Sequence, residues 1–254
     1  MVAALAFLAT AVATRFWQTM LVRWTSRRRP HEAAWMVSLA LFALACAALA
    51  TGASTGWDVG TFRAFYLFGT INVVWLALGT VWLLAPPRAA KVSRDVVLAY
   101  SALTAGVVLA APTRAEIVGD DIPAGKDVFG PLPRVLAVVG NSLGATVLLV
   151  GAVWSAWRYW RGAPDRERDG RMAASNALIA VGTLLLASSG VFTGFLSDDE
   201  AFAVCLLAGI AVIYTGFTVS VAAPHPLRGR WSRTSRPVGV RGSPSIHDAD
   251  PGHL

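Results

Sequence analysis

The sequence predicts an all-α membrane protein, a polytopic bundle of seven transmembrane helices with the N-terminus outside the cell and the C-terminus in the cytoplasm. Hydrophobic residues make up 55% of the 254 residues and charged residues only 15%, against about 25% charged residues in a soluble domain. The charges stand in short clusters between seven apolar runs, and each run approaches the ~20 residues with which a helix crosses a bilayer. A soluble fold would have to bury all seven runs.

Each apolar run is expected to be helical, because backbone groups in contact with lipid must form their hydrogen bonds within the segment. No proline lies inside a run, so unbroken helices are expected. After the last run the chain is rich in Arg, Ser, Pro and Gly, which predicts a disordered, basic cytoplasmic tail over 223–254. The predicted transmembrane domain is 1–222, with spans at 1–22, 33–51, 64–85, 95–112, 134–157, 173–195 and 201–222.

The distribution of basic residues predicts the orientation. The segments after spans 1, 3, 5 and 7 hold 17 Arg and Lys residues, whereas the opposite side holds only Arg63, Arg114, Lys126 and Arg134. The richer side is expected to be cytoplasmic. The first span ends in an A-V-A sequence like a signal-peptide cleavage site, but it lacks the basic start of a signal peptide. We therefore expect it to be retained as a helix.

Spans 3 and 6 share a short sequence, with Gly79-Thr80 in the first and Gly182-Thr183 in the second. One extra helix followed by two inverted three-helix units would produce such a match. Because the shared residues are common ones, chance similarity is the alternative interpretation.

Three polar side chains form a candidate pocket, namely Asn72 in the middle of span 3, Tyr66 in the same span and Tyr100 in span 4. A mid-membrane asparagine needs a hydrogen-bonding partner, because lipid offers none. One hypothesis is a small cavity, open to the outside, around these residues. The alternative is hydrogen bonding between helices, at about 0.6–2 kcal/mol per contact.

Glycines that include G-x-x-x-G pairs in spans 5 and 6 predict close helix packing. Packing within the bundle is the first interpretation and self-association is the second. The candidate packing residues are Gly140, Gly144, Gly151, Gly190 and Gly194.

Motifs for catalysis, metal binding or cofactor binding are missing from the sequence. The spans contain no histidine for an intramembrane haem, and the last span contains no lysine for retinal. Cys46 and Cys205 are expected to be ordinary buried thiols. The acidic stretch DDIPAGKD between spans 4 and 5 is long enough to hold Ca²⁺, but it matches no EF-hand and a solvated acidic face is the alternative.

Two segments, RRRPHEAAWMVSLALFALA (27–45) and FRAFYLFGTINVVWLALGTVWLLAPPR (62–88), resemble uncharacterised seven-helix membrane proteins of GC-rich Gram-positive bacteria. The resemblance implies a location in the bacterial cytoplasmic membrane. It implies no activity, so it assigns no functional residue.

Two classes of function fit these observations. The first is a non-enzymatic partner subunit, scaffold or sensor that acts through helix packing, with another membrane protein or a second copy as its partner. The second is a transporter or channel for a small neutral or cationic solute. The bilayer is the expected partner in both, because arginines beside apolar spans explain the pI of 10.2 through the anionic inner leaflet better than through nucleic acid.

Overall fold

The computed structural model describes residues 1–114, 117, 119, 121–161, 166–191 and 198–222. The end of the predicted span 173–195 and the predicted tail 223–254 therefore lie outside the described residues.

Helices and short connections make up the described chain, and no strand occurs among these residues. The prediction of an all-α fold is confirmed. The long helices extend the predicted spans by several residues at one or both ends, because polar and charged residues continue the helices beyond the apolar runs. The helices are α1 (Val2–Arg27), α2 (Pro30–Thr55), α3 (Val59–Leu84), α4 (Pro87–Ala110), α5 (Gly125–Val128), α6 (Pro131–Arg161), α7 (Arg166–Val191) and α8 (Asp199–Ala222).

Six helices, α1 to α4, α6 and α8, are long and apolar enough to cross a membrane. The described apolar part of α7 runs from Ala173 to Ser189, after the charged start RERDGR of the helix, and the rest of the predicted span 173–195 continues into residues outside those described. The described part alone is near the lower end of the ~17–25 residues that span a bilayer. The long apolar helices thus fit the membrane class of the prediction, while the count of seven spans stays a prediction.

The starts of the long helices follow from local sequence. Proline stands at the beginning of α2, α4 and α6, where its fixed φ suits a helix and its missing N–H costs nothing. Asp58 caps α3, since its Oδ1 accepts hydrogen bonds from the N–H groups of Gly60 at 2.7 Å and Thr61 at 3.1 Å. Hydrogen bonds from the Thr61 hydroxyl and N–H hold the pKa of this exposed carboxyl below its usual range.

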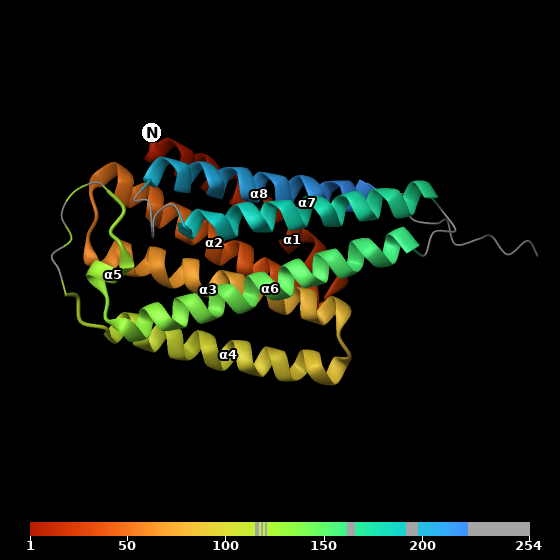
Figure 1. Ribbon diagram of the computed structural model, residues 1–254, viewed down its shortest axis with the longest axis horizontal. Helices are drawn as coiled ribbons and strands as arrows, with labels where there is room; N and C mark the ends of the chain where they lie inside the picture. The colour runs from red at the N-terminus through yellow and green to blue at the C-terminus, as the bar shows by residue number, and fades with distance from the viewer. Residues whose placement is uncertain (115–116, 118, 120, 162–165, 192–197, 223–254) are drawn as a thin grey trace, which may run out of the picture. The chain divides into compact units, whose positions relative to one another are not determined.

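Six helices form a closed ring in which neighbours pack in the order α1, α2, α3, α6, α7, α8 and back to α1. Helix α4 lies outside the ring against α3 and one end of α6 (Figure 1). We call the end with the α2–α3 and α4–α6 connections the loop end. The opposite end, with the α1–α2 and α3–α4 connections, is the arginine end.

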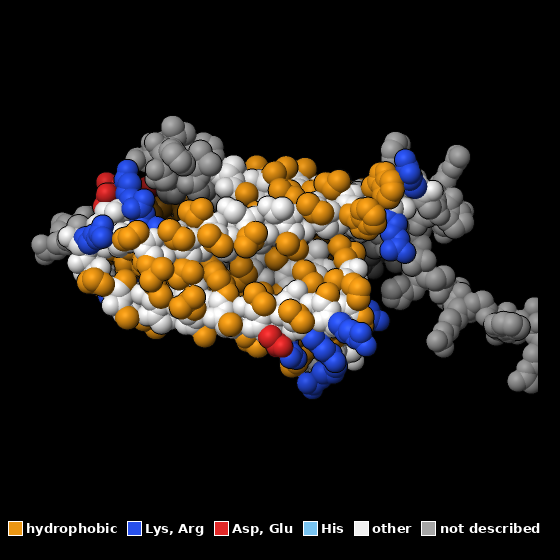
Figure 2. All heavy atoms as spheres, turned by 60° about the horizontal axis from the view of Figure 1, so that its bottom comes forward, with side chains coloured by type: hydrophobic (Ala, Val, Ile, Leu, Met, Phe, Trp, Pro, Cys, Tyr) orange, Lys and Arg blue, Asp and Glu red, His pale blue; other side chains and the backbone are white. Residues whose placement is uncertain are grey.

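The surface matches a position in a bilayer. Figure 2 shows a face on which hydrophobic side chains cover the middle of the bundle, whereas Lys and Arg gather towards its ends. Helix α4 illustrates this, because Ala90, Thr104 and Val108 are its only buried residues and its exposed side chains include Val96, Leu103 and Leu109. An apolar surface this extensive suits lipid and is rare on soluble monomers.

Helices α7 and α8 meet along a seam of small residues. A Cβ added to Gly182 would lie 2.8 Å from the carbonyl oxygen of Gly209. One heptad away, Ser175 donates a hydrogen bond of 2.6 Å to the carbonyl oxygen of Gly216. The two backbones approach so closely that no larger side chain fits at Gly182.

Candidate functional site

A cavity of about 610 Å³ lies inside the ring and is lined by residues from α2, α3, α6, α7 and α8. Its volume is within the roughly 300–1,000 Å³ of sites for small molecules. Apolar side chains form most of the wall, among them Phe42, Phe65, Leu76, Leu148, Leu186, Phe202 and Leu206. The Asn, Ser and Thr side chains in the wall are Thr70, Asn72, Asn141, Ser142, Thr146, Thr183 and Ser189. No charged side chain lines this cavity among the described residues.

Two of the three residues in the predicted pocket lie together in this wall, Asn72 and Tyr66. The third, Tyr100, is not a lining residue: its hydroxyl donates a 2.9 Å hydrogen bond to the carbonyl oxygen of Leu136, and its ring lies against Gly140. Tyr100 therefore joins α4 to α6 and lies apart from Asn72 and Tyr66.

Asn72 is 7% exposed and makes its side-chain hydrogen bonds to its own helix. Its amide nitrogen donates to the carbonyl oxygens of Phe68 at 3.1 Å and Gly69 at 2.8 Å. Its backbone carbonyl oxygen accepts a 2.8 Å hydrogen bond from the Ser38 hydroxyl of α2. The contact between α2 and α3 thus uses the backbone of Asn72, and the side-chain oxygen is the polar atom left for a partner in the cavity.

Hydroxyl groups in the wall also direct their protons to helix carbonyls. Thr183 donates to Ile179 at 2.8 Å, Ser189 to Leu186 at 2.7 Å and Thr146 to Ser142 at 2.7 Å. Each hydroxyl oxygen keeps a lone pair with which it can accept a hydrogen bond. Sequence reasoning missed these residues, because a hydroxyl that bonds to the preceding turn is common in any transmembrane helix.

The cavity opens between α6 and α7. Among its lining residues, Asn141, Ser142 and Thr146 of α6 and Ala187 of α7 are exposed. All four lie within the apolar parts of their helices, Pro131–Ser155 and Ala173–Ser189. The opening is therefore at a depth that the hydrocarbon of a bilayer would occupy.

At the loop end, the α4–α6 connection closes over the aromatic edge of the cavity. Tyr66 lies so close to Gly125 of α5 that an added Cβ would come within 2.9 Å of its ring, and the ring of Phe129 packs edge-on against Tyr66 at 5.1 Å. Asp199 of α8 accepts a 2.7 Å hydrogen bond from the N–H of Ile122. These contacts connect the loop to both α3 and α8, the helices that carry Tyr66 and Phe202.

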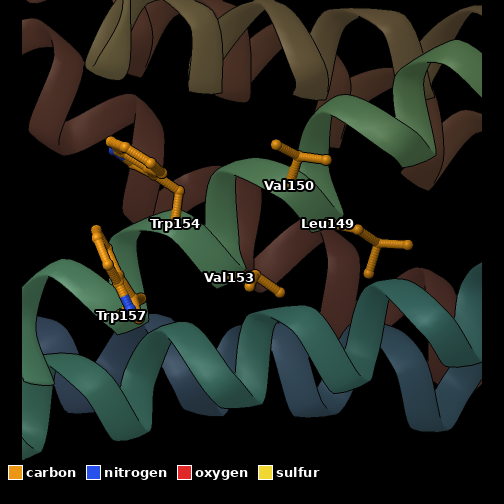
Figure 3. A pocket seen from close by; sticks show the side chains of 5 residues that line it. All are labelled: Leu149, Val150, Val153, Trp154 and Trp157. Carbon is orange, nitrogen blue, oxygen red and sulfur yellow. The ribbon is translucent and has the colours of Figure 1, made fainter.

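A second, shallower hollow lies on the surface of α6 (Figure 3). Its lining is entirely apolar, with Leu149, Val150, Val153, Trp154 and Trp157 projecting from one stretch of the helix. The rings of Trp154 and Trp157 lie 5.4 Å apart, and the Arg161 guanidinium lies 4.4 Å from the Trp157 ring. Tryptophan beside arginine at a helix end is typical of the membrane interface. This hollow has no polar group to orient a ligand and suits an acyl chain.

The predicted packing glycines of α6 face other helices of the same chain. A Cβ at Gly144 would lie 2.8 Å from Val73 Cγ1, and one at Gly151 would lie 2.5 Å from Thr80 Cγ2, both on α3. Gly140 faces Tyr100 of α4. Gly190 belongs to α7, and Gly194 lies outside the described residues.

The most buried charged residue among those that the structure describes was not predicted from the sequence. Glu32, in the first turn of α2, is 1% exposed, and neither of its carboxylate oxygens has a hydrogen-bond partner among the described residues. The nearest cation is Arg23 of α1, with 3.6 Å between its Nη2 and Glu32 Oε1. A carboxylate next to a basic cluster looks interfacial in the sequence, and only the packing of α1 against α2 buries it.

The acidic stretch considered for Ca²⁺ is only partly described. Asp121 and Asp127 are exposed, and Asp120 lies outside the described residues. In the part of the chain that the structure describes, no three His, Cys, Asp or Glu side chains gather where they could hold a metal ion.

Comparison with known proteins yields no family. No protein-family model matches the chain, and no curated protein or solved structure matches it either. The function is therefore argued from the cavity and the membrane character of the bundle.

Proposed function

We propose that this chain is a multi-pass protein of the bacterial cytoplasmic membrane that binds a small uncharged molecule in the cavity between α3, α6 and α7. Seven spans, an outside N-terminus and a cytoplasmic C-terminus are part of the proposal. The six apolar helices long enough to span a membrane, together with α7, support it. So does the excess of 17 basic residues over four on opposite sides of the spans.

The observation that carries the functional proposal is the uncharged lining of the cavity. An ion inside it would lose its hydration without gaining a counter-charge, which costs several kcal/mol or more. This argues against the cationic solute that the sequence allowed and favours a neutral one. Because binding inside the bundle is what both a transporter and a sensor require, uptake and signalling are the two uses of such a site.

The packing-based alternative is a partner subunit or scaffold. It receives less support, because Gly140, Gly144 and Gly151 are already covered by α3 and α4 of the same chain. The feature that supports it is α4, whose mostly exposed surface faces away from the bundle. Cysteine cross-linking from Leu103 on that face, in native membranes, would detect a protein partner there.

Reporter fusions test the orientation. Positive-inside counting predicts cytoplasmic activity for reporters fused after Arg29, Lys91 and Arg168, and external activity after Trp57, Asp121 and Asp199. The measurement is paired alkaline phosphatase and fluorescent-protein fusions in a bacterial host. An external signal after Arg29 would reverse the proposed orientation.

Thermal unfolding of the purified protein against a metabolite library tests the function. We expect neutral ligands that stabilise the wild type and stabilise Asn72→Leu less, because the substitution removes the free amide oxygen from the wall. Loss of the Asn72 side-chain bonds should itself cost at most ~1–2 kcal/mol. Asn176→Leu is the matched control, since this asparagine bonds to Ser155 and does not line the cavity. A library without a stabilising ligand for the wild type would refute the proposed function.

A further inference from the structure

We infer that the cavity selects a neutral amphiphile that donates a hydrogen bond, an alcohol with a long apolar body taken up from the bilayer. The inference rests on the proposed binding function and specifies the ligand class of the same site. Three features of the cavity lead to it, and each concerns a different part of the ligand.

The first feature is whether the hydrogen-bonding groups in the wall are free to donate or only to accept. Of its seven Asn, Ser and Thr side chains, Asn72, Thr146, Thr183 and Ser189 already donate to helix carbonyls. These four side chains offer acceptors, and only a ligand that supplies a proton can bond to them. Among the described residues, the side chains of Thr70, Asn141 and Ser142 donate no hydrogen bond, so these three can donate to a ligand as well as accept from it. A hydroxyl group can pair with both kinds of side chain, whereas an ether would leave the four acceptors unpaired.

The second feature is the large apolar share of the wall. Leu76 and Leu148 lie towards the arginine end, and Phe65, Phe202 and Leu206 lie towards the loop end. Asn72 and Thr183 contribute their acceptors from two different helices, α3 and α7. A molecule with a hydroxyl on a long apolar body matches this arrangement, whereas a sugar or another polyol would leave most of its polar groups unpaired.

The third feature is the position of the opening. Exposed Ser142, Thr146 and Ala187 mark it within the apolar parts of α6 and α7. At that depth the surrounding solvent is hydrocarbon. A ligand that enters there must already be dissolved in the bilayer, which a fatty alcohol is and a sugar is not.

Two probes that differ in one hydrogen-bond donor test the inference. The full-length protein in lipid nanodiscs is titrated with 1-dodecanol and with methyl undecyl ether, which has the same number of heavy atoms, and the dissociation constants are expressed as bilayer mole fractions. We expect the alcohol to bind about five-fold more tightly, the effect of one net hydrogen bond. Dodecanoate, the charged analogue, should compete for neither probe.

Variants locate the preference in the cavity. Thr183→Val, at constant shape, and Asn72→Leu remove two of the four acceptors. Together they should reduce the preference for the alcohol from about five-fold to less than about two-fold. Thr10→Val is the matched control, because Thr10 makes the same hydrogen bond to the preceding turn of α1 and lies outside the cavity lining. In that variant the five-fold preference should persist.

The outcomes separate the two proposals. Equal binding of the alcohol and the ether, or a preference that survives in the Thr183→Val/Asn72→Leu double variant, would overturn the ligand class while leaving a neutral binding site in place. Binding of neither probe to the wild type would overturn the binding function together with the inference.

Discussion

Replacing Arg23 with methionine should lower the free energy of unfolding by about 3–5 kcal/mol, the cost of leaving a buried carboxylate without its counter-charge. Arg23 is the cation nearest to Glu32, which is 1% exposed. Its guanidinium also lies 5.1 Å from the ring of Phe217 on α8. The side chain thus connects α1 with both α2 and α8 at the arginine end. Unfolding by SDS in mixed micelles measures the change.

Two comparisons assign the cause. Arg27→Met changes an exposed arginine of the same helix end and should shift stability by no more than about 0.5 kcal/mol. In a Glu32→Gln background, Arg23→Met should lower the free energy of unfolding by only about 1 kcal/mol, because no buried carboxylate is then left without a counter-charge. Equal losses in both backgrounds would instead attribute the effect to packing against Phe217.

Gly182→Leu should destabilise the protein by about 1–3 kcal/mol or more through overpacking of the α7–α8 seam. Its Cβ would lie 2.6 Å from the Ile213 side chain, 2.8 Å from the carbonyl oxygen of Gly209 and 3.0 Å from the backbone nitrogen of Ile213. Backbone atoms cannot turn aside as a flexible side chain can, so α7 and α8 must separate. Thermal unfolding in detergent measures the loss.

The same substitution at Gly106 is the control. Gly106 lies in α4, and a Cβ there would meet nothing within 4 Å. Gly106→Leu should leave stability unchanged or raise it by up to about 1 kcal/mol, because leucine favours a helix more than glycine does. If Gly182→Leu unfolds at the same temperature as Gly106→Leu, the seam is not the close contact described above.

Hydropathy alone determined the class of this protein and the approximate place of its long helices. The free energy of transferring a segment from water to lipid depends on that segment's own residues, so apolar runs can be recognised without knowing what they contact. The prolines at the starts of α2, α4 and α6 are equally local signals, although the predicted spans begin later, at 33, 95 and 134.

Polarity along the chain also identified part of the candidate site. Asn72 stood out because an amide in an apolar run needs a partner, and Tyr66 lies in the same helix near the end that faces the loop. For Tyr100 the prediction was wrong, because the sequence does not show that its hydroxyl donates a hydrogen bond to the carbonyl oxygen of Leu136. A polar residue in an apolar run can be predicted to need a hydrogen-bonding partner, but the neighbouring sequence does not identify that partner.

Only the tertiary structure decided which helix faces meet. The seam of Ser175 and Gly182 against Gly216 and Gly209 joins residues of two helices at seven-residue spacing, so a search for four-residue glycine pairs does not find it. Burial of Glu32 likewise depends on α1 lying across α2. The cavity exists because six helices pack as a ring, and the space that they enclose is not encoded in any single helix. Local transfer energies are additive along the chain, whereas packing depends on pairs of surfaces that the chain brings together only when folded.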